Sequence, residues 1–573
     1  MEIIEEEFNK LQPIFNEGKK YLIGKNKDIK LSIQNYEQYL LKLDNLFQEL
    51  KNKQNDINFI ENLNLTYISH IIKLIKIFLL IPYYYKTKSL CEKVLEIDKD
   101  NIEILPSYIK CLHYFRKYEL IIDILNNNKH NDNEKIKELK LKNNDRIKES
   151  NGEYDFKKIF QNFKKSNNFN LDLAEYACNK ISIQQDKIKG LILCAKEEIQ
   201  KGTLLIASKA IEYVPKEDNK LIKIFYKKEE YQKKLLKKIR DKMIYCKEDI
   251  PEIYELYDKT NSHLSLEERK QNYINNISNN NNIIISENNL AGIFSNAIAT
   301  KLYLYDEYDI ALGIFYYPSF MSHSCIPNTR ILGVGNFIFI FAETLIKKNE
   351  EITTSYIDCT EEYKIRQEKL KKFYGFECGC ELCLYEKNKF KEMPEIKNKI
   401  NTYINELINL INSPNYNQKL YFEKANEITK FINEHNDKIN NYEKGVLYYN
   451  LFCLWPYNDG YLQNYNLLKE GLQCCENENN MKINILIYYF LLKMYKLNFV
   501  FNDKLCIEIR KKMILLFTEV LGNKQQEFIE ILLDDLLNMY TSNDDREIKG
   551  LKIFKLKELK ELKEKLGKIT NIS

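Results

Sequence analysis

The stretch FMSHSCIPNTR, residues 320–330, decides the fold of this chain of 573 residues. It follows an apolar run and places a His–Ser–Cys triplet, residues 323–325, directly before Ile326 and a Pro–Asn pair. The plainest interpretation is a turn with an incidental cysteine. Because the chain holds 14 cysteines, this interpretation has to be weighed against the motifs around the stretch.

A second cysteine cluster lies downstream in FYGFECGCELC, residues 373–383. Cys378, Cys380 and Cys383 have the spacing C-x-C-x2-C, and three thiolates this close together can bind one zinc ion. A structural zinc site is tetrahedral and needs a fourth ligand, for which Cys325 is the candidate. Zinc would then clamp two distant segments together. The alternative is that the spacing arises by chance in a chain with many cysteines.

The composition is that of a folded protein without a dominant charged partner. Apolar residues make up 44% and charged residues 29%, and the net charge is +5. This near balance argues against direct nucleic-acid binding. The N-terminal MEIIEEEFNK lacks the basic-then-apolar order of a signal peptide, and the longest apolar runs are too short to span a bilayer. We therefore expect a soluble cytoplasmic or nuclear protein with reduced cysteines and no membrane contact.

Apolar positions at helical spacing fill residues 30–125. Within 91–125 the pattern indicates a helix that ends at Leu95–Ile97, a polar turn, a second helix, a break at Arg116–Tyr118 and a third helix. This layout resembles the junction between two tetratricopeptide repeats, whose helix pairs bury their apolar faces by stacking. An ordinary helical hairpin domain is the alternative.

Short β-type runs interrupt the helices in the centre, and helices return from residue 361 onward. We therefore predict an α+β multidomain chain with a β-rich core split by a helical insertion, flanked by helical, tetratricopeptide-like domains. The predicted bounds are 1–150 for the first helical domain, 151–180 for a linker, 181–214 and 291–360 for the two parts of the core, 215–290 for the insertion, 361–390 for the cysteine segment and 391–573 for the last helical domain.

Three motifs in this order, SHSCIPN (322–328), NEEITTSYID (349–358) and C-x-C-x2-C, resemble those of SET-domain protein methyltransferases. The chain is most similar to the SET-and-MYND group, in which a helical insertion splits the SET core and a tetratricopeptide-like domain follows. The resemblance covers about residues 181–385 and implies that 361–390 is a zinc-binding post-SET segment. Residues 211–290 hold only Cys246 and His263 as possible ligands, so we expect the MYND zinc finger to be absent.

The resemblance also implies which residues hold S-adenosylmethionine, the target lysine and zinc. Tyr356 matches the catalytic tyrosine of the family, and Tyr374 and Phe376 match the aromatic residues of its lysine channel. The positions that match cofactor contacts are Lys187, Lys189, Gly190, Asn296, Ser322, His323, Tyr356 and Phe376. Those that match the zinc ligands are Cys325, Cys378, Cys380 and Cys383.

The chain departs from the family pattern at three positions. Ile188 replaces the first glycine of Gly-x-Gly-Leu, so Gly190 alone is retained. Ser322 replaces the first Asn of Asn-His-Ser-Cys, and a side-chain amide contact to the cofactor is lost with it. Asn349 replaces the turn glycine of Gly-Glu-Glu-x-Thr, a position where Asn tolerates a left-handed backbone.

Several of these residues have a simpler alternative role. Lys187 and Lys189 are then solvated surface charges, and His323 is a structural histidine. Cys194 and Cys359 fit no ligand spacing, and we expect them to be small buried apolar residues.

Taken together, the motifs predict an S-adenosylmethionine-dependent protein-lysine N-methyltransferase that acts on histone or other protein lysines. Such a reaction needs no nucleophile from the protein, because the lysine amine attacks the sulfonium methyl group in line and catalysis is mostly alignment and desolvation. We expect a monomer with structural zinc whose helical domains bind peptides or proteins. The alternative is a non-catalytic SET scaffold that binds partner proteins.

Overall fold

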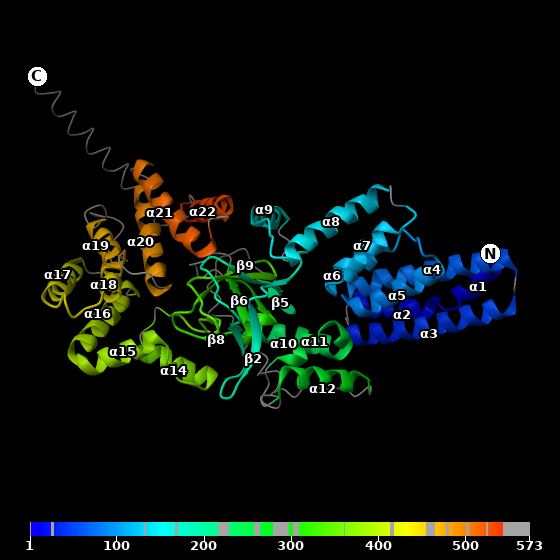
Figure 1. Cartoon of the computed structure of the whole chain (residues 1–573), viewed down its shortest axis with the longest axis horizontal. Helices are drawn as coiled ribbons and strands as arrows, with labels where there is room; N and C mark the ends of the chain where they lie inside the picture. Colours follow the sequence, from blue (N-terminus) through cyan, green and yellow to red (C-terminus); the bar gives the residue numbers. More distant parts are fainter. Residues whose placement is uncertain are drawn as a thin grey trace, which may run out of the picture.

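The computed structural model describes residues 2–541 with internal gaps. The gaps are 24–27, 55, 131–132, 167–169, 216–227, 257–263, 279–296, 302–308, 360, 362, 413–417, 454–464, 477–480, 500–502 and 523–524. A helical N-terminal part, a β-rich centre and a helical C-terminal part follow one another along the long axis of the molecule (Figure 1).

Helices make up the described N-terminal part. They are α1 (Glu2–Asn9), α2 (Gln12–Ile23), α3 (Ile29–Lys53), α4 (Ile57–Leu80), α5 (Tyr84–Ile97), α6 (Leu105–Tyr114), α7 (Tyr118–Asn126) and α8 (Glu134–Ser150). The starts of α5 and α7 are about 34 residues apart, the length of a tetratricopeptide repeat, whereas α3 and α4 are 25 and 24 residues long. The tetratricopeptide-like character of this domain stays a prediction.

Helix α4 is long and apolar enough, by length and composition alone, to cross a membrane. In the structure 56% of its most apolar window is buried, and Leu63, Leu74 and Phe78 lie in the core that it shares with α3 and α5. The buried core helix of a helical domain has the same length and apolar composition. The expectation of no membrane contact stays a prediction.

The centre is built from short strands in four small sheets. Strands β1 (Tyr176–Ala177), β4 (Leu204–Lys209), β10 (Phe337–Ala342) and β9 (Thr329–Val334) form one sheet in this order. The others are β2 (Ile181–Asp186) with β3 (Gly190–Ala195), β5 (Glu212–Pro215) with β7 (Asp309–Ile314) and β6 (Ala297–Lys301), and β8 (Ser322–His323) with β11 (Thr353–Thr354).

Strand β10, with the sequence FIFIFA, is buried on both faces. Successive side chains of a strand point to opposite faces. Phe337, Phe339 and Phe341 accordingly join a core formed with the C-terminal helices, whereas Ile338 and Ile340 join the core of the β-rich centre. One strand therefore contributes to both apolar cores and joins the central sheet to the C-terminal helices.

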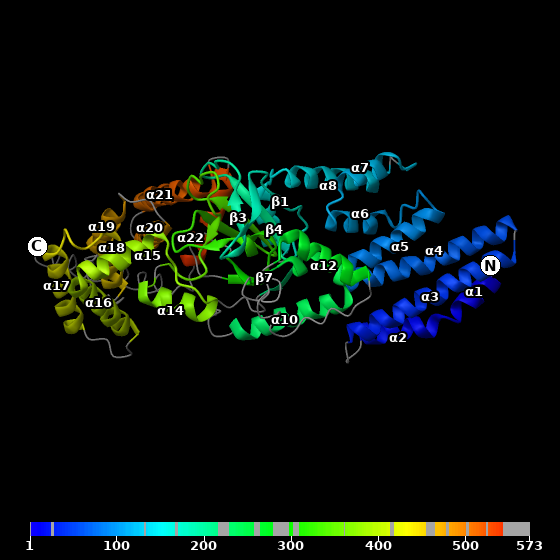
Figure 2. The ribbon, with the colours of Figure 1, turned by 60° about the horizontal axis from the view of Figure 1, so that its bottom comes forward.

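The remaining described helices fill the insertion and the C-terminal part, in which α21 contacts strand β10 and α22 contacts the segment 156–166 (Figure 2). Helices of the insertion are α10 (Lys228–Tyr245), α11 (Pro251–Glu255) and α12 (Leu266–Ser278). Those after the core are α14 (Tyr363–Tyr374), α15 (Glu381–Glu392), α16 (Pro394–Asn412), α17 (Gln418–Glu434), α18 (Asn441–Cys453), α19 (Tyr465–Cys475), α20 (Met481–Phe499), α21 (Asp503–Leu521) and α22 (Gln526–Tyr540).

The insertion is anchored to the N-terminal domain. The Asp249 carboxylate accepts hydrogen bonds from the backbone N–H groups of Tyr84 and Tyr85, each at 2.7 Å, at the start of α5. The Tyr114 hydroxyl donates to the Asp249 carbonyl at 2.5 Å, and Cys246 is buried in the N-terminal core. His263 lies outside the described residues, and the absence of a MYND finger stays a prediction.

The structure differs from the predicted linker at 151–180. Residues 156–166 form helix α9 (Phe156–Ser166), and its apolar face is buried in the core of the C-terminal helices. The Phe156 ring packs 4.8 Å from Phe339 and 5.5 Å from Phe528, measured between centroids. This short helix is thus part of the interior, because its aromatic residues reach a sheet and a helix that are distant in sequence.

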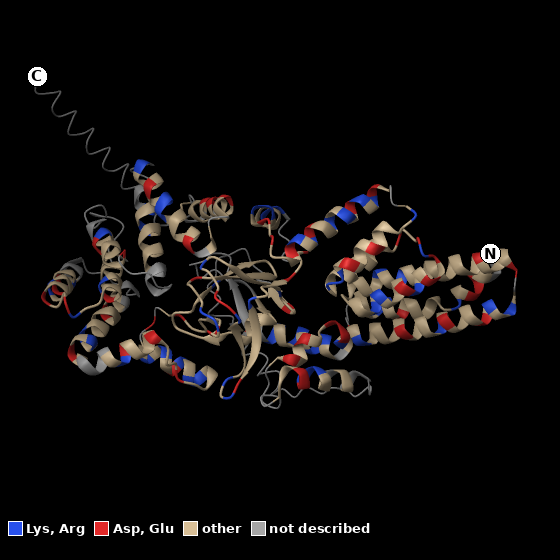
Figure 3. Cartoon of the chain, viewed as in Figure 1, with Lys and Arg blue, Asp and Glu red and all other residues tan. Residues whose placement is uncertain are grey.

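Charged side chains of both signs are interspersed over the described helices (Figure 3), as the near balance of basic and acidic residues predicts. The absence of a nucleic-acid partner stays a prediction.

We predict that Phe156→Ala lowers the free energy of unfolding by about 3 to 5 kcal/mol, because it leaves a cavity between the sheet and the C-terminal helices. The exposed Gln161 on the same helix provides the control, and Gln161→Ala should stay within about 0.5 kcal/mol. Urea unfolding followed by circular dichroism measures both. Equal stability of the two variants would show that the packing of α9 does not contribute to the stability of the interior.

Candidate functional site

The candidate site is built where the loop after β8 crosses the loop before β11. Strands β8 and β11 pair in parallel, with Ser322 beside Thr353, and Ser324 N–H donates to the Thr354 carbonyl at 3.0 Å. The Asn328 side chain secures the crossing, since its Oδ1 accepts from Thr353 N–H at 2.9 Å and its Nδ2 donates to the Glu351 carbonyl at 2.8 Å. The SHSCIPN and NEEITTSYID motifs are therefore interlocked.

The second of these motifs is held to strand β3 on its other side. Asn349 N–H donates to the Ala195 carbonyl at 2.8 Å and Ile352 N–H to the Leu193 carbonyl at 2.8 Å. Asn349 has a φ of 65°, which confirms the left-handed backbone predicted there. Residues 349–354 thus lie between β3, which begins at Gly190, and β8.

Tyr356 follows directly after this crossing. Its hydroxyl donates to the Met321 carbonyl at 2.5 Å, and its backbone N–H donates to Nδ1 of His323 at 3.1 Å. Burial of the phenol is the largest cause that raises its pKa, and the nearby Tyr374 and Glu351 add to it. The residue as a whole keeps 36% of its surface exposed. A neutral phenol is thus held in place at the edge of the site.

An aromatic cluster surrounds Tyr356 and consists of His323, Tyr356, Tyr374 and Phe376. The ring centroids lie 5.0 Å apart for Tyr356 and Tyr374, 5.2 Å for His323 and Tyr356, and 5.9 Å for His323 and Phe376. The Tyr374 hydroxyl also donates to the Tyr356 carbonyl at 3.4 Å. The structure therefore brings together the four aromatic residues that the sequence analysis assigned to cofactor and lysine.

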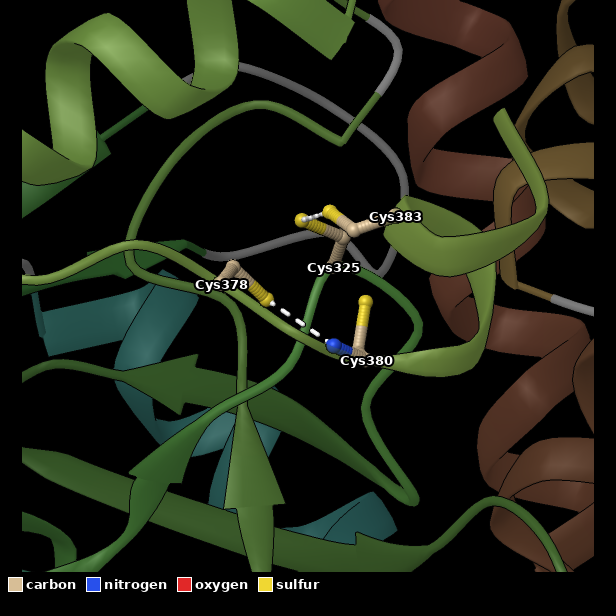
Figure 4. Close-up of side chains that lie close together, drawn as sticks. All are labelled: Cys325, Cys378, Cys380 and Cys383. Atoms are coloured by element: carbon tan, nitrogen blue, oxygen red, sulfur yellow. Dashed lines mark hydrogen bonds between the residues drawn. The ribbon is translucent and has the colours of Figure 1, made fainter. Parts of the chain in front are cut away.

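The four predicted zinc ligands also converge. Cys325 comes from the loop after β8, Cys378 and Cys380 from the segment after α14, and Cys383 from the first turn of α15. Their sulfur atoms all lie within 4.8 Å of one another and the side chains point toward a common centre (Figure 4). Hydrogen bonds that the thiols make with one another, the one with Cys325 being the largest cause, lower the pKa of Cys380 to about 6, whereas the pKa values of Cys325 and Cys383 are raised. A bound metal would hold all four as thiolates.

The geometry of the cysteine group fits zinc. A tetrahedral site with Zn–S distances of about 2.3 Å has S···S edges of about 3.8 Å, and the sulfur atoms of Cys325 and Cys383 are 3.6 Å apart. Four thiolates are a common ligand set of structural zinc. Cys325, Cys378, Cys380 and Cys383 would hold the ion and join the loop after β8 to α14 and α15.

Sequence reasoning missed Arg366, which lies behind the cysteine group on α14 and is fully buried. Its Nε is 3.4 Å from the sulfur of Cys325 and its Nη2 is 3.7 Å from that of Cys383. The same Nη2 pairs with Glu386 at 2.5 Å. Four thiolates around Zn²⁺ leave a net negative charge, which this guanidinium offsets. The available signal was its spacing four residues before the apolar Leu370, which marks the buried face of α14.

The remaining predicted cofactor residues lie around or beyond this group. Gly190 has a φ of 79° at the start of β3, and Ser322 lies in β8 beside His323. The Lys189 ammonium is held by the Glu351 carboxylate at 2.6 and 2.9 Å, so this lysine is an ion-pair partner rather than a freely available cation. Lys187 is exposed at the tip of the β2–β3 hairpin.

Two further predictions concern residues near the core. Asn296 lies outside the described residues. Cys194 and Cys359 are buried, at 3% and 2% exposure, as expected for small apolar residues.

Residues 190–357 match the SET domain family, which confirms the SET domain that the motifs predicted. Relatives include a protein of Acanthamoeba polyphaga mimivirus named for its SET domain, 30% identical over 106 residues, which are 18% of this chain and 40% of that protein. The histone-lysine N-methyltransferase SET5 of Vanderwaltozyma polyspora is 34% identical over 100 residues, 17% of this chain and 20% of that protein.

A SET and MYND domain-containing protein of Dictyostelium discoideum is 38% identical over 74 residues, 13% of this chain and 14% of that protein. The chain thus spans well under half the length of each of these relatives. The likeness lies in the SET region, and the helical domains on either side of it are not matched by the family.

We predict that the purified chain binds one zinc ion and that Cys325→Ser loses it, because a tetrahedral site cannot close on three sulfurs. Cys474→Ser is the matched control, since Cys474 is half-buried among the C-terminal helices and is not part of the cysteine group. Elemental analysis of the three proteins gives the stoichiometry. Full zinc occupancy in Cys325→Ser would remove Cys325 from the site.

For Arg366 we expect Arg366→Gln to weaken zinc binding by roughly 10-fold to 100-fold, the usual effect of losing an outer partner of a ligand. Arg366→Lys keeps the charge and should lose less. Competition with a chromogenic chelator measures both affinities. Zinc affinity that is unchanged in Arg366→Gln would mean that the guanidinium serves packing and its ion pair with Glu386 alone.

Proposed function

We propose that this chain is an S-adenosylmethionine-dependent protein-lysine N-methyltransferase with structural zinc. The observation that carries the proposal is the aromatic cluster of His323, Tyr356, Tyr374 and Phe376 beside the interlocked loops of a SET domain. Relatives named as histone-lysine methyltransferases support the same reaction class. The proposed substrate is a lysine of a histone or of another protein.

Tyr356 would align the target amine rather than take its proton. Its hydroxyl hydrogen is committed to the Met321 carbonyl, so the oxygen lone pairs are left to accept a hydrogen bond from the lysine nitrogen. Its raised pKa keeps the phenol neutral at physiological pH, and a neutral phenol is a poor base. The lysine proton would therefore leave to solvent before transfer.

The other rings would enclose the lysine side chain. Faces of Tyr374 and Phe376 can contact its methylene groups and stabilise the cationic methylated product. Exclusion of water by these rings favours the neutral amine, because burial disfavours a charged ammonium. When bound, S-adenosylmethionine supplies the methyl group. The lysine nitrogen forms the new N–C bond as the S–C bond breaks, and the electron pair of that bond remains on sulfur.

Gly190, Ser322 and His323 would line the pocket for the methyl donor. The left-handed backbone of Gly190 lets the main chain approach a ligand closely, since no Cβ intervenes. Ser322 is shorter than the family's Asn, and we expect it to contribute less affinity. Lys189 is not assigned a contact to the donor, because Glu351 neutralises it.

The helical domains would select the protein substrate. Helix α5 begins one repeat length before α7, and stacked helix pairs of this kind present extended concave surfaces to peptides or proteins. We further propose a monomeric protein of the cytoplasm or nucleus.

A second candidate function is a non-catalytic scaffold that binds partner proteins through its helices. Ser322 in place of Asn favours it, as does Ile188, which stands at the glycine position and is 94% exposed. Calorimetry with S-adenosylmethionine separates the two functions. Absence of heat and of any thermal shift at millimolar donor would favour the scaffold and overturn the enzyme.

For the enzyme we predict that Tyr356→Phe lowers the rate of labelled methyl transfer to histones and lysate proteins roughly a hundredfold, the scale expected for one preorganised polar contact. Tyr385→Phe is the matched control, because Tyr385 is 44% exposed on α15 and lies outside the aromatic cluster. Transfer at the wild-type rate in Tyr356→Phe would show that this tyrosine is misassigned.

A further inference from the structure

His323 belongs to the aromatic cluster and also contacts the cysteine group. Its Nδ1 accepts the hydrogen bond from Tyr356 N–H at 3.1 Å, and its Nε2 lies 3.4 Å from the sulfur of Cys325. One imidazole ring therefore joins the backbone of the proposed catalytic tyrosine to a predicted metal ligand.

The first of these contacts fixes the tautomer of the ring. A backbone N–H can only donate, so Nδ1 has to accept and carries no proton. In the neutral imidazole the proton is then on Nε2, which faces the Cys325 sulfur. The arrangement is a chain of two hydrogen bonds that run from Tyr356 N–H to Nδ1 and from Nε2–H to sulfur.

We propose that His323 is a positioning residue that couples metal occupancy of the cysteine group to the methyl-donor and lysine pocket; the inference rests on the function proposed above. The Cys325 sulfur lies 3.4 Å from Nε2 and belongs to the group of four sulfurs that lie within 4.8 Å of one another. A bound metal would hold this sulfur at one position relative to the other three. It would thereby fix the acceptor of Nε2–H and, with it, the plane of the imidazole.

The ring in turn helps to position Tyr356, whose hydroxyl is held separately by the Met321 carbonyl. Strand β11 ends at Thr354, so the strand pairing that holds Thr353 and Thr354 does not extend to Tyr356. Among the described residues, the hydrogen bond that holds its N–H goes to His323. The imidazole also packs against Phe376 at 5.9 Å, so a rotation of the ring would shift two walls of the pocket.

Two substitutions of His323 test its two hydrogen bonds separately. In His323→Asn the side-chain oxygen can take the place of Nδ1, whereas nothing reaches the sulfur. In His323→Gln the longer amide can donate to the sulfur, whereas the acceptor for Tyr356 N–H is lost. Each variant therefore removes one of the two hydrogen bonds of His323, and the two variants remove different ones.

The test is the affinity for S-adenosylmethionine in the zinc-loaded and the chelator-treated protein, measured by calorimetry. For wild type we expect affinity about tenfold weaker without metal, within the usual range of coupling between sites. In both variants this ratio should fall to about twofold or less. A ratio as large as that of wild type in both variants would overturn the proposal, whatever their stability.

Cobalt provides a readout that does not require a stable metal-free chain. In wild type loaded with Co²⁺, S-adenosylmethionine should shift the sulfur-to-cobalt charge-transfer band, because binding reorients the ring that donates to Cys325. In His323→Asn and His323→Gln the band should not respond, and an unchanged response in both variants would refute the coupling.

The two proposals fail differently in these experiments. S-adenosylmethionine that binds wild type equally well with and without metal, and leaves the cobalt band unchanged, would overturn the coupling and leave the methyltransferase intact. No binding to zinc-loaded wild type would overturn the methyltransferase and the coupling together.

Discussion

The crossing of two loops, secured by the Asn328 side chain, is the constraint on which the rest of the site depends. The buried amide of Asn328 accepts two hydrogen bonds from Thr353 and donates one each to Glu350 and Glu351, and these bonds hold residues 322–328 against residues 349–354. The same loop carries His323 toward Tyr356 and Cys325 toward the later cysteines. A carboxamide suits this place because it donates and accepts at once, and a buried polar group left unpaired costs free energy. The contacts of Asn328 thus hold the paired backbones together and also position the side chains of the site.

Segments outside the SET motifs complete the apolar core of the SET domain. Alternate side chains of β10 belong to two different cores, so the central sheet is completed by C-terminal helices and by α9. Asp249 of the insertion caps the start of α5 in a similar way. Sequence segments that look like separate domains therefore share interiors, and we expect them to lose stability together when one of these contacts is removed.

The cysteine group and the aromatic cluster could be predicted because their ligands and rings stand in short motifs with fixed spacing. The contact of Arg366 with the cysteines, the ion-pair partner of Lys189 and the burial of α9 could not be predicted. Each depends on a contact between segments far apart in the chain, and an isolated arginine or a short Lys-rich helix has the pattern of a solvated surface. The left-handed Asn349 is an intermediate case, since a single turn position determines it and residue type alone predicts it.

The link through His323 bears on the loss of the family's Asn at position 322. A ligand binds a protein with an apparent affinity reduced by the fraction of molecules whose site is correctly arranged. With one side-chain contact fewer, the proposed pocket would depend more on that fraction. A metal-bound sulfur that fixes the imidazole, and helps through it to position Tyr356, would raise the fraction without touching the ligand. In this chain the cysteine group would therefore contribute to binding as well as to folding, which gives the short Ser322 a compensating partner within the same loop.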